Sequence, residues 1–116
     1  MRILILLLVA SVLALIYQVK FADPHGGQRA LASWYGPGLY GNPQACGGRL
    51  TRSTVGVAHK TLPCGSYVTI CYRRCARLRV IDRGPFTAGR TFDLTAPARD
   101  RIGMRGGVIS VRWWRS

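Results

Sequence analysis

Apolar and polar residues alternate in several short stretches of the chain, and glycine- or proline-rich turns separate these stretches. The alternation predicts β-strands at residues 31–35, 55–59, 67–71, 76–82, 90–94 and 107–114. A short helix is expected between Thr95, a favourable N-cap residue, and Gly103, which would end it. Many short strands with one or two short helices favour a mainly β fold, a closed barrel.

The N-terminal pattern is different, because residues 3–17 form an apolar run without a charge, preceded by Arg2 and followed by polar residues. This layout is typical of a signal peptide or of an N-terminal membrane anchor. As a helix the run would span about 22 Å, which is shorter than the roughly 30 Å hydrocarbon core of a bilayer. A buried core helix is a third interpretation. We expect a signal peptide or anchor at 1–22, a linker at 23–30 and one folded domain at 31–116.

The cysteines add a constraint on the folded part. Export places the chain in an oxidising compartment, where cysteines pair and where a domain this small benefits from cross-links. Cys71 and Cys75 flank a hairpin loop, and opposing Cα atoms of a hairpin lie at a distance that suits a disulfide. We favour Cys71–Cys75, which leaves Cys46–Cys64. The other two connectivities remain open. A zinc site is disfavoured because two Cys-x-x-Cys pairs are missing, and no metal or cofactor is expected.

The charge balance is strongly positive, at +13, and 17 basic residues face only four acidic ones. Such a charge attracts polyanions, which include nucleic acids, anionic lipids and anionic wall polymers. No basic helix or nucleic-acid motif organises the basic residues, so we expect no specific nucleic-acid partner. Contact with a membrane is expected only through the N-terminal segment.

Two of the four aspartates lie close together in the sequence and are candidates for chemistry. Asp82 ends a predicted strand and opens the turn DRGPF, and Asp93 lies within TFDLT, where alternation turns it away from its apolar neighbours. Asp82 could alternatively cap a turn, and Asp93 could pair with an arginine. His59 ends another strand and could be structural or handle protons. Trp34 and Tyr35 could stack on sugar rings or belong to the core.

Other catalytic classes find little support. The chain has no serine nucleophile elbow and no phosphate-binding loop, and two histidines are too few for a typical catalytic zinc site. Paired cysteines would leave no thiol nucleophile.

Four stretches resemble, in order, the rare lipoprotein A family with its double-psi β-barrel. They are ASWYGPGLYG, GVAHKTLPCGSYVTI, RLRVIDRGPF and GRTFDLTAPARDRIGM, and together they cover nearly all of residues 31–114. LPCG and TFDL are also similar to segments of the related expansins. The resemblance implies a six-stranded double-psi β-barrel of the expansin and endoglucanase superfamily.

The resemblance also implies a function in the bacterial envelope. Characterised relatives act on peptidoglycan as lytic transglycosylases, which cleave the glycan strand without water and leave a 1,6-anhydro end. His59 matches the functional histidine of AHKTLP, Asp82 matches the catalytic aspartate of DRGPF, and Asp93 matches the aspartate of the following strand. Active relatives have a glutamate eleven residues before that histidine, where this chain has Gly48.

Two hypotheses follow for an exported, monomeric protein of the cell envelope whose partner is peptidoglycan or another wall polysaccharide. In the first, it is a lytic-transglycosylase-like enzyme with Asp82 and His59 as catalytic residues, since a single carboxyl group can give and retake a proton. In the second, it is a non-catalytic, expansin-like binder or loosener of wall polysaccharide. Arg83, Asp93, Trp34 and Tyr35 are expected to contact the glycan under both hypotheses.

Overall fold

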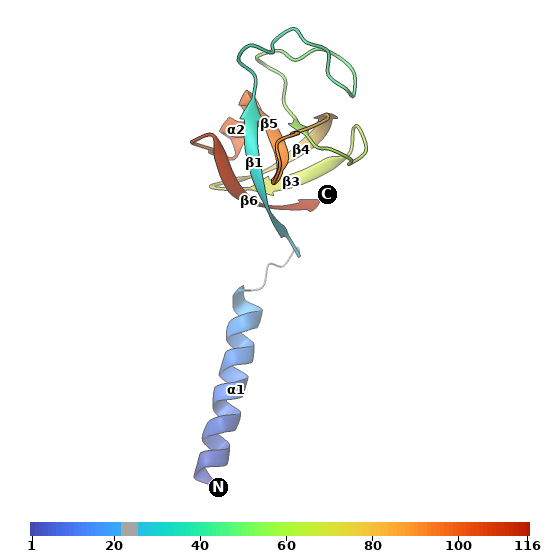
Figure 1. The fold of residues 1–116 in the computed structure, drawn as a ribbon. Helices are drawn as coiled ribbons and strands as arrows, with labels where there is room; N and C mark the ends of the chain where they lie inside the picture. The colour runs from blue at the N-terminus through green and yellow to red at the C-terminus, as the bar shows by residue number, and fades with distance from the viewer. Residues whose placement is uncertain (22–25) are drawn as a thin grey trace.

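The computed structural model describes residues 1–21 and 26–116, which form two helices and six strands (Figure 1). In chain order these are α1 (Arg2–Phe21), β1 (Gln28–Tyr35), β2 (Val57–Ala58), β3 (Tyr67–Cys71), β4 (Cys75–Asp82), β5 (Arg90–Thr95), α2 (Ala96–Arg101) and β6 (Val108–Arg115). Among the described residues, no helix meets the length and apolarity that crossing a membrane requires. The choice between a signal peptide and an anchor at residues 1–22 stays a prediction.

The six strands close into a barrel in the order β1-β5-β2-β4-β3-β6. The pairs β1–β5 and β2–β4 are parallel, and the pairs β1–β6, β2–β5, β3–β4 and β3–β6 are antiparallel. The parallel pairs join strands that are distant in the sequence, so the chain must cross the barrel rather than wind around it as a meander. The prediction of a mainly β, closed six-stranded barrel with an N-terminal helix is confirmed.

Alternate residues of the strands fill the barrel interior, as the sequence pattern predicts. The largest fully buried side chain is that of Phe92 in β5, whose ring meets the ring of Trp113 edge to face at 4.9 Å. The same buried core contains Leu94 from β5 and, from other strands, Val57, Val68, Ile70, Leu78, Val80 and Val111. Residues between these positions point away from the interior and are available for a site on the outside of the barrel.

Two strands differ from their predicted bounds by more than one residue at an end. β1 begins at Gln28 instead of residue 31, because residues 28–30 pair with β6. The expected linker at 23–30 therefore overlaps the strand, and its residues 23–25 lie outside the described part of the chain. β2 contains only Val57 and Ala58 instead of residues 55–59, and its register with β4 shifts between these two residues.

Both favoured disulfides are present. Cys71–Cys75 closes the β3–β4 hairpin with a Cα–Cα distance of 4.0 Å, and these two residues are register partners. Cys46–Cys64, at 5.5 Å, joins the long loop after β1 to the turn after β2. The second disulfide therefore connects two segments that neither helix nor sheet would hold together.

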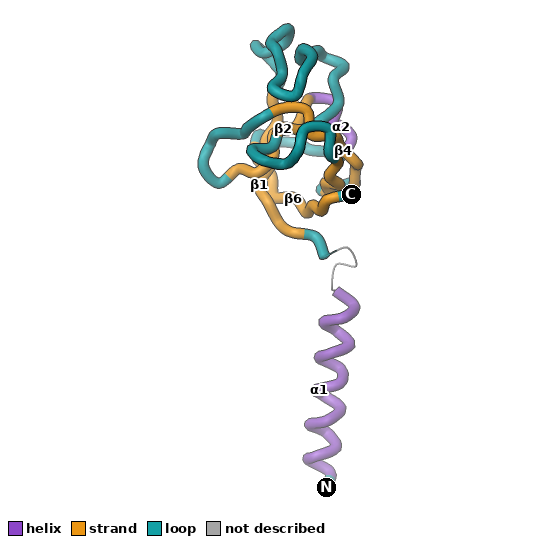
Figure 2. The backbone as a smooth tube through the Cα atoms, turned by 90° about the vertical axis from the view of Figure 1, so that its right-hand side faces the viewer, coloured by secondary structure: helices purple, strands orange, loops and turns teal. Residues whose placement is uncertain are grey.

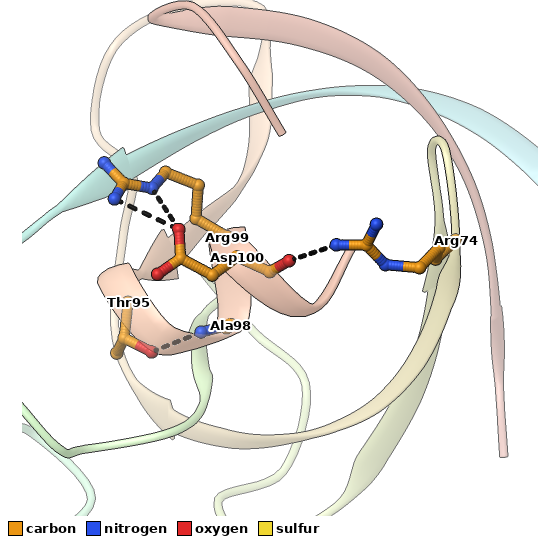
Figure 3. A network of polar contacts seen from close by, with 5 residues as sticks. All are labelled: Arg74, Thr95, Ala98, Arg99 and Asp100. Carbon is orange, nitrogen blue, oxygen red and sulfur yellow. Dashed lines mark hydrogen bonds and ion pairs between the residues drawn. The ribbon is translucent and has the colours of Figure 1, made fainter. Parts of the chain in front are cut away.

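Helix α2 is capped at both ends (Figure 3). At its start, the Thr95 hydroxyl accepts hydrogen bonds from the backbone N–H of Ala98 at 3.4 Å and of Gly56 at 3.2 Å. At its end, the Arg74 guanidinium donates to the carbonyl oxygens of Asp100 at 2.7 Å and Arg101 at 3.1 Å. Thr95 thus satisfies orphan N–H groups of the helix and of the segment entering β2 at once.

We predict that Thr95→Val lowers the free energy of unfolding by about 1–2 kcal/mol, because it keeps the side-chain shape but leaves two buried N–H groups unpaired. Urea unfolding followed by circular dichroism measures the change. Thr95→Ser, which retains the hydroxyl, should lose clearly less stability. Equal losses in the two variants would show that the methyl group contributes as much as the hydroxyl and would contradict a dominant role of its hydrogen bonds.

Candidate active site

The short strand β2 brings Asp82 and Asp93 onto one face of the barrel. Ala58 in β2 is the register partner of Asp82 in β4 and of Asp93 in β5, and Asp93 in turn pairs with Ser33 in β1. Register partners on neighbouring strands point to the same side of a sheet. The two carboxylates therefore flank the small side chain of Ala58, with their backbones about 9–10 Å apart, two inter-strand spacings.

A cavity of about 220 Å³ lies over this row. The barrel lines it with Tyr35, Ala58, Asp82 and Asp93, and the loop between β1 and β2 contributes Leu39, Pro43, Gln44 and Leu50. Figure 1 shows this loop rising beyond the end of β1, and Figure 2 shows it standing clear of the strands in a second view. The cavity is smaller than the roughly 300–1,000 Å³ of typical drug-sized sites, so it suits one unit of a longer polymer.

Asp82 connects the barrel to the loop that covers it. Its Oδ1 accepts hydrogen bonds from the backbone N–H of Ala45 at 2.8 Å and of Arg83 at 2.9 Å. The second of these bonds is the turn-capping contact that DRGPF indicated as an alternative. Asp82 is nevertheless only half-buried and lines the cavity, so it can cap the turn and also contact a molecule bound in the cavity.

Asp93 holds its proton more strongly than an ordinary carboxyl group. Burial raises its pKa, and the negative charge of Asp82 adds to this effect. The hydrogen bond that its Oδ1 accepts from the Ser33 hydroxyl, at 3.1 Å, and the charge of Arg90 oppose the rise without cancelling it. A carboxyl group whose pKa is raised by burial in a cavity is a candidate proton donor.

The sequence predicted Tyr35 as a site residue, but it did not predict Gln44. Tyr35 was expected to bind through its ring, and the structure places its buried hydroxyl at the cavity with Asp82 and Gln44 beside it. Burial, followed by the charge of Asp82, raises its pKa, so the hydroxyl stays protonated. Gln44 lies in a glycine-rich loop without periodicity, where the sequence has no signal for the direction of a side chain.

His59 is not brought into this cavity. Its Nδ1 accepts hydrogen bonds from the backbone N–H of Thr61 at 3.1 Å and of Leu62 at 3.0 Å. Its ring packs 5.2 Å from Phe92. Burial, with the charges of Arg83 and Lys60, lowers its pKa, so the imidazole is neutral at neutral pH. In this position His59 shapes the turn that leads to Cys64.

Arg83 and Trp34 also make structural contacts. The Arg83 guanidinium donates to the carbonyl oxygens of His59 at 3.2 Å and Leu62 at 2.6 Å, while part of its side chain lines the cavity. The ring of Trp34 packs against the core, and the guanidinium of Arg99 lies 4.0 Å over it. A sugar that stacked on this face of Trp34 would have to displace Arg99.

No group of three or more histidine, cysteine, aspartate or glutamate side chains in the described part of the chain is arranged to hold a metal ion. The polar residues that line the cavity carry two carboxyl groups, a phenol, two amides and a guanidinium: Asp82, Asp93, Tyr35, Asn42, Gln44 and Arg83.

Comparison with known families gives a match over most of the barrel. A family model described as "Lytic transglycolase" matches residues 28–113. Curated relatives include the probable endolytic peptidoglycan transglycosylase RlpA of Synechocystis sp., 44% identical over 82 residues, or 68% of this chain and 26% of the relative. The endolytic peptidoglycan transglycosylase RlpA of Campylobacter jejuni is 38% identical over 86 residues, or 71% of this chain and 31% of the relative. The chain thus spans about a third or less of these relatives.

Solved structures show the same fold at lower identity. An expansin of Clavibacter michiganensis superposes with a TM-score of 0.61 at 20% identity, over 78% of this chain and 50% of the expansin. A mutant of that expansin has been solved in complex with cellohexaose. The Streptomyces papain inhibitor superposes with a TM-score of 0.59 at 25% identity, over 79% of this chain and 96% of the inhibitor.

We predict that Asp93→Asn stabilises the protein at neutral pH. Below both pKa values the folded and unfolded states are protonated alike, and burial carries no ionisation cost. As the pH rises, the unfolded chain releases its proton first, so the wild type loses stability, and the loss is complete above the raised pKa of the folded state. Asparagine never ionises and can still accept the Ser33 hydrogen bond.

Thermal unfolding of the wild type and the variant between about pH 3 and pH 7 tests this expectation. The variant should gain melting temperature relative to the wild type across that interval. A difference that does not change with pH would contradict a buried ionisation penalty at Asp93.

Proposed function

Since the chain belongs to the lytic transglycolase family, the RlpA-like double-psi β-barrels related to the expansins, we propose that it cleaves the glycan strands of bacterial peptidoglycan at the cavity between Asp82 and Asp93. The observation that carries the proposal is the placement of both carboxylates beside Ala58 in one cavity. The curated relatives are named for this activity, and the chain contains the barrel portion of them.

Cleavage without water needs two proton movements. A carboxylic acid protonates the glycosidic oxygen as the bond between that oxygen and the anomeric carbon breaks, and positive charge develops on the sugar. The C6 hydroxyl of the same sugar then bonds to the anomeric carbon, and the carboxylate removes the hydroxyl proton. The strand is cut, a 1,6-anhydro end forms and the carboxylic acid is regenerated, so one group serves as acid and then as base.

We assign these proton movements to Asp93 because its raised pKa keeps it protonated to a higher pH than an ordinary carboxyl group. The family resemblance would give them to Asp82. Asp82 instead has its Oδ1 held by two backbone N–H groups, which fixes a carboxylate where it can stabilise the positive charge on the sugar. His59 and Arg83 act indirectly, by holding the turn at residues 59–64.

The proposed location is the cell envelope. Two disulfides and no free cysteine in the described chain suit an oxidising compartment, and the relatives act on a wall polymer. Residues 1–22 would direct export or anchor the chain, and the barrel would work as a monomer on peptidoglycan.

We predict that Asp93→Asn and Asp82→Asn each reduce cleavage at least about 100-fold, because a positioned acid or base typically contributes that much. The assay uses peptidoglycan strands freed of stem peptides and counts 1,6-anhydro ends by mass spectrometry. Asp100→Asn is the matched control, because this aspartate is exposed on α2 and paired with Arg99. If the wild type releases no anhydro ends where an active relative does, the enzyme proposal fails.

A second candidate function is non-catalytic binding of wall polysaccharide. It is supported by the fold shared with an expansin that has been solved with cellohexaose, and by Gly48 at the position of the family's glutamate. Gly48 has a φ of 74°, a conformation that a glutamate would adopt only with strain.

For the binding function we predict that the protein co-sediments with purified sacculi and stays bound at about 0.5 M salt, where attraction based on charge alone is screened. A lysine-rich protein of similar net charge is the control. Binding that disappears together with that of the control would contradict a specific glycan site.

A further inference from the structure

Two buried polar groups of the cavity have no partner. The hydroxyl of Tyr35 and the amide nitrogen Nε2 of Gln44 are shielded from solvent, and neither makes a well-formed hydrogen bond within the described structure. Gln44 and Asp82 lie close enough to the Tyr35 hydroxyl for hydrogen bonding to affect its pKa, yet no contact of the hydroxyl reaches the distance and angle of a hydrogen bond. Buried donors without partners are costly and rare in native proteins, so their presence calls for a partner that the chain does not supply.

Both groups are held rigidly. Tyr35 is the last residue of β1 and is the register partner of Thr95 in β5. The backbone of Gln44 donates to the Gly48 carbonyl at 2.9 Å, and its own carbonyl accepts from Gly47 at 3.1 Å. The next residue, Ala45, donates to Asp82. The backbone that carries the two donors is therefore anchored relative to the carboxylates, as a preorganised binding site requires.

The chemistry of the two groups identifies what they would bind. Nε2 of Gln44 can only donate, and the protonated phenol of Tyr35 donates readily. A carbonyl oxygen has two lone pairs and can accept from both donors at once. Apolar side chains of Leu39 and Leu50 line the same cavity and offer a surface for a methyl group.

We propose that Tyr35 and Gln44 form a subsite for the acetamido group of a 2-acetamido sugar, with its carbonyl oxygen between the two donors and its methyl group against Leu39 and Leu50. The subsite rests on the proposed function and specifies its substrate class. A glucose unit carries only a hydroxyl at the same carbon, which reaches fewer of these groups. The cavity therefore distinguishes an N-acetylated glycan from a glucan.

The subsite also orients the sugar. Its donors lie on the loop and at the end of β1, whereas Asp82 and Asp93 supply acceptors from β4 and β5. An acetamido group held at the donors turns the rest of the ring toward the carboxylates. A Cβ atom added at Gly48 would lie 4.0 Å from Oε1 of Gln44 and would meet nothing closer, so Gly48 leaves the Gln44 amide uncrowded.

Calorimetric titration of the full chain with chitohexaose and with cellohexaose tests the proposal, because the two sugars share length and β-1,4 linkage and differ at the acetamido group. We expect the wild type to bind chitohexaose about tenfold more tightly. Gln44→Met and Tyr35→Phe should each reduce chitohexaose affinity about tenfold and leave cellohexaose affinity nearly unchanged. Tyr67→Phe, on an exposed tyrosine of β3, is the matched control. A thermal melt of each variant verifies folding.

Equal affinity for the two sugars in the wild type, or no binding of either at millimolar concentration, overturns the subsite. An equal loss of affinity for chitohexaose and cellohexaose in the variants overturns the assignment of the subsite to Tyr35 and Gln44. Selective binding of chitohexaose without anhydro ends in the cleavage assay leaves the subsite standing and overturns the proposed enzyme activity. Cleavage of peptidoglycan without selectivity between the two hexasaccharides leaves the enzyme proposal standing and overturns the subsite.

Discussion

The candidate site depends on the pairing of a two-residue strand, β2, with β4 on one side and β5 on the other. This pairing puts Ala58 between Asp82 and Asp93, which come from strands that are otherwise not neighbours. Because the methyl group of Ala58 is small, the space between the carboxylates stays open. The alternating residues Val57 and Leu94 face inward and anchor the same strands in the core. Core packing therefore fixes the carboxylates.

The loop over this row is attached at few points, and each attachment also serves the site. Cys46–Cys64 joins the loop to the turn after β2, and the Ala45–Asp82 hydrogen bond joins it to the end of β4. These links hold the loop over the cavity that Asp93, Tyr35 and Gln44 line. Burying polar groups there costs free energy, which the disulfide helps to offset. Buried polar groups without partners are expected in a site where a bound ligand supplies those partners. A small domain with disulfide cross-links can tolerate the stability that such groups cost.

Most of the fold was predictable from the sequence because its signals are local. Strand β3 and helix α2 follow from alternation and from Thr95, and the hairpin pairing of Cys71 with Cys75 follows from the span of three residues between them. The site was predictable only in part. Asp82 and Asp93 were recognisable as candidates, but their meeting depends on long-range pairing through β2. Gln44 lies in an irregular loop, and the ring of His59 points elsewhere because backbone N–H groups occupy its Nδ1.

The positive charge of the chain is partly structural, and this affects the chemistry of the cavity. Arg74 caps α2, Arg83 holds the turn after β2, and Arg99 stacks on Trp34. Arg74 and Arg83 bind neutral carbonyl groups in those contacts, so their charge is not cancelled and still attracts anionic polymers, whereas Arg99 also pairs with Asp100. The same field favours ionised carboxylates, which opposes acid catalysis. At Asp93 burial outweighs the hydrogen bond from Ser33 and the charge of Arg90, so its pKa is raised in spite of the positive field.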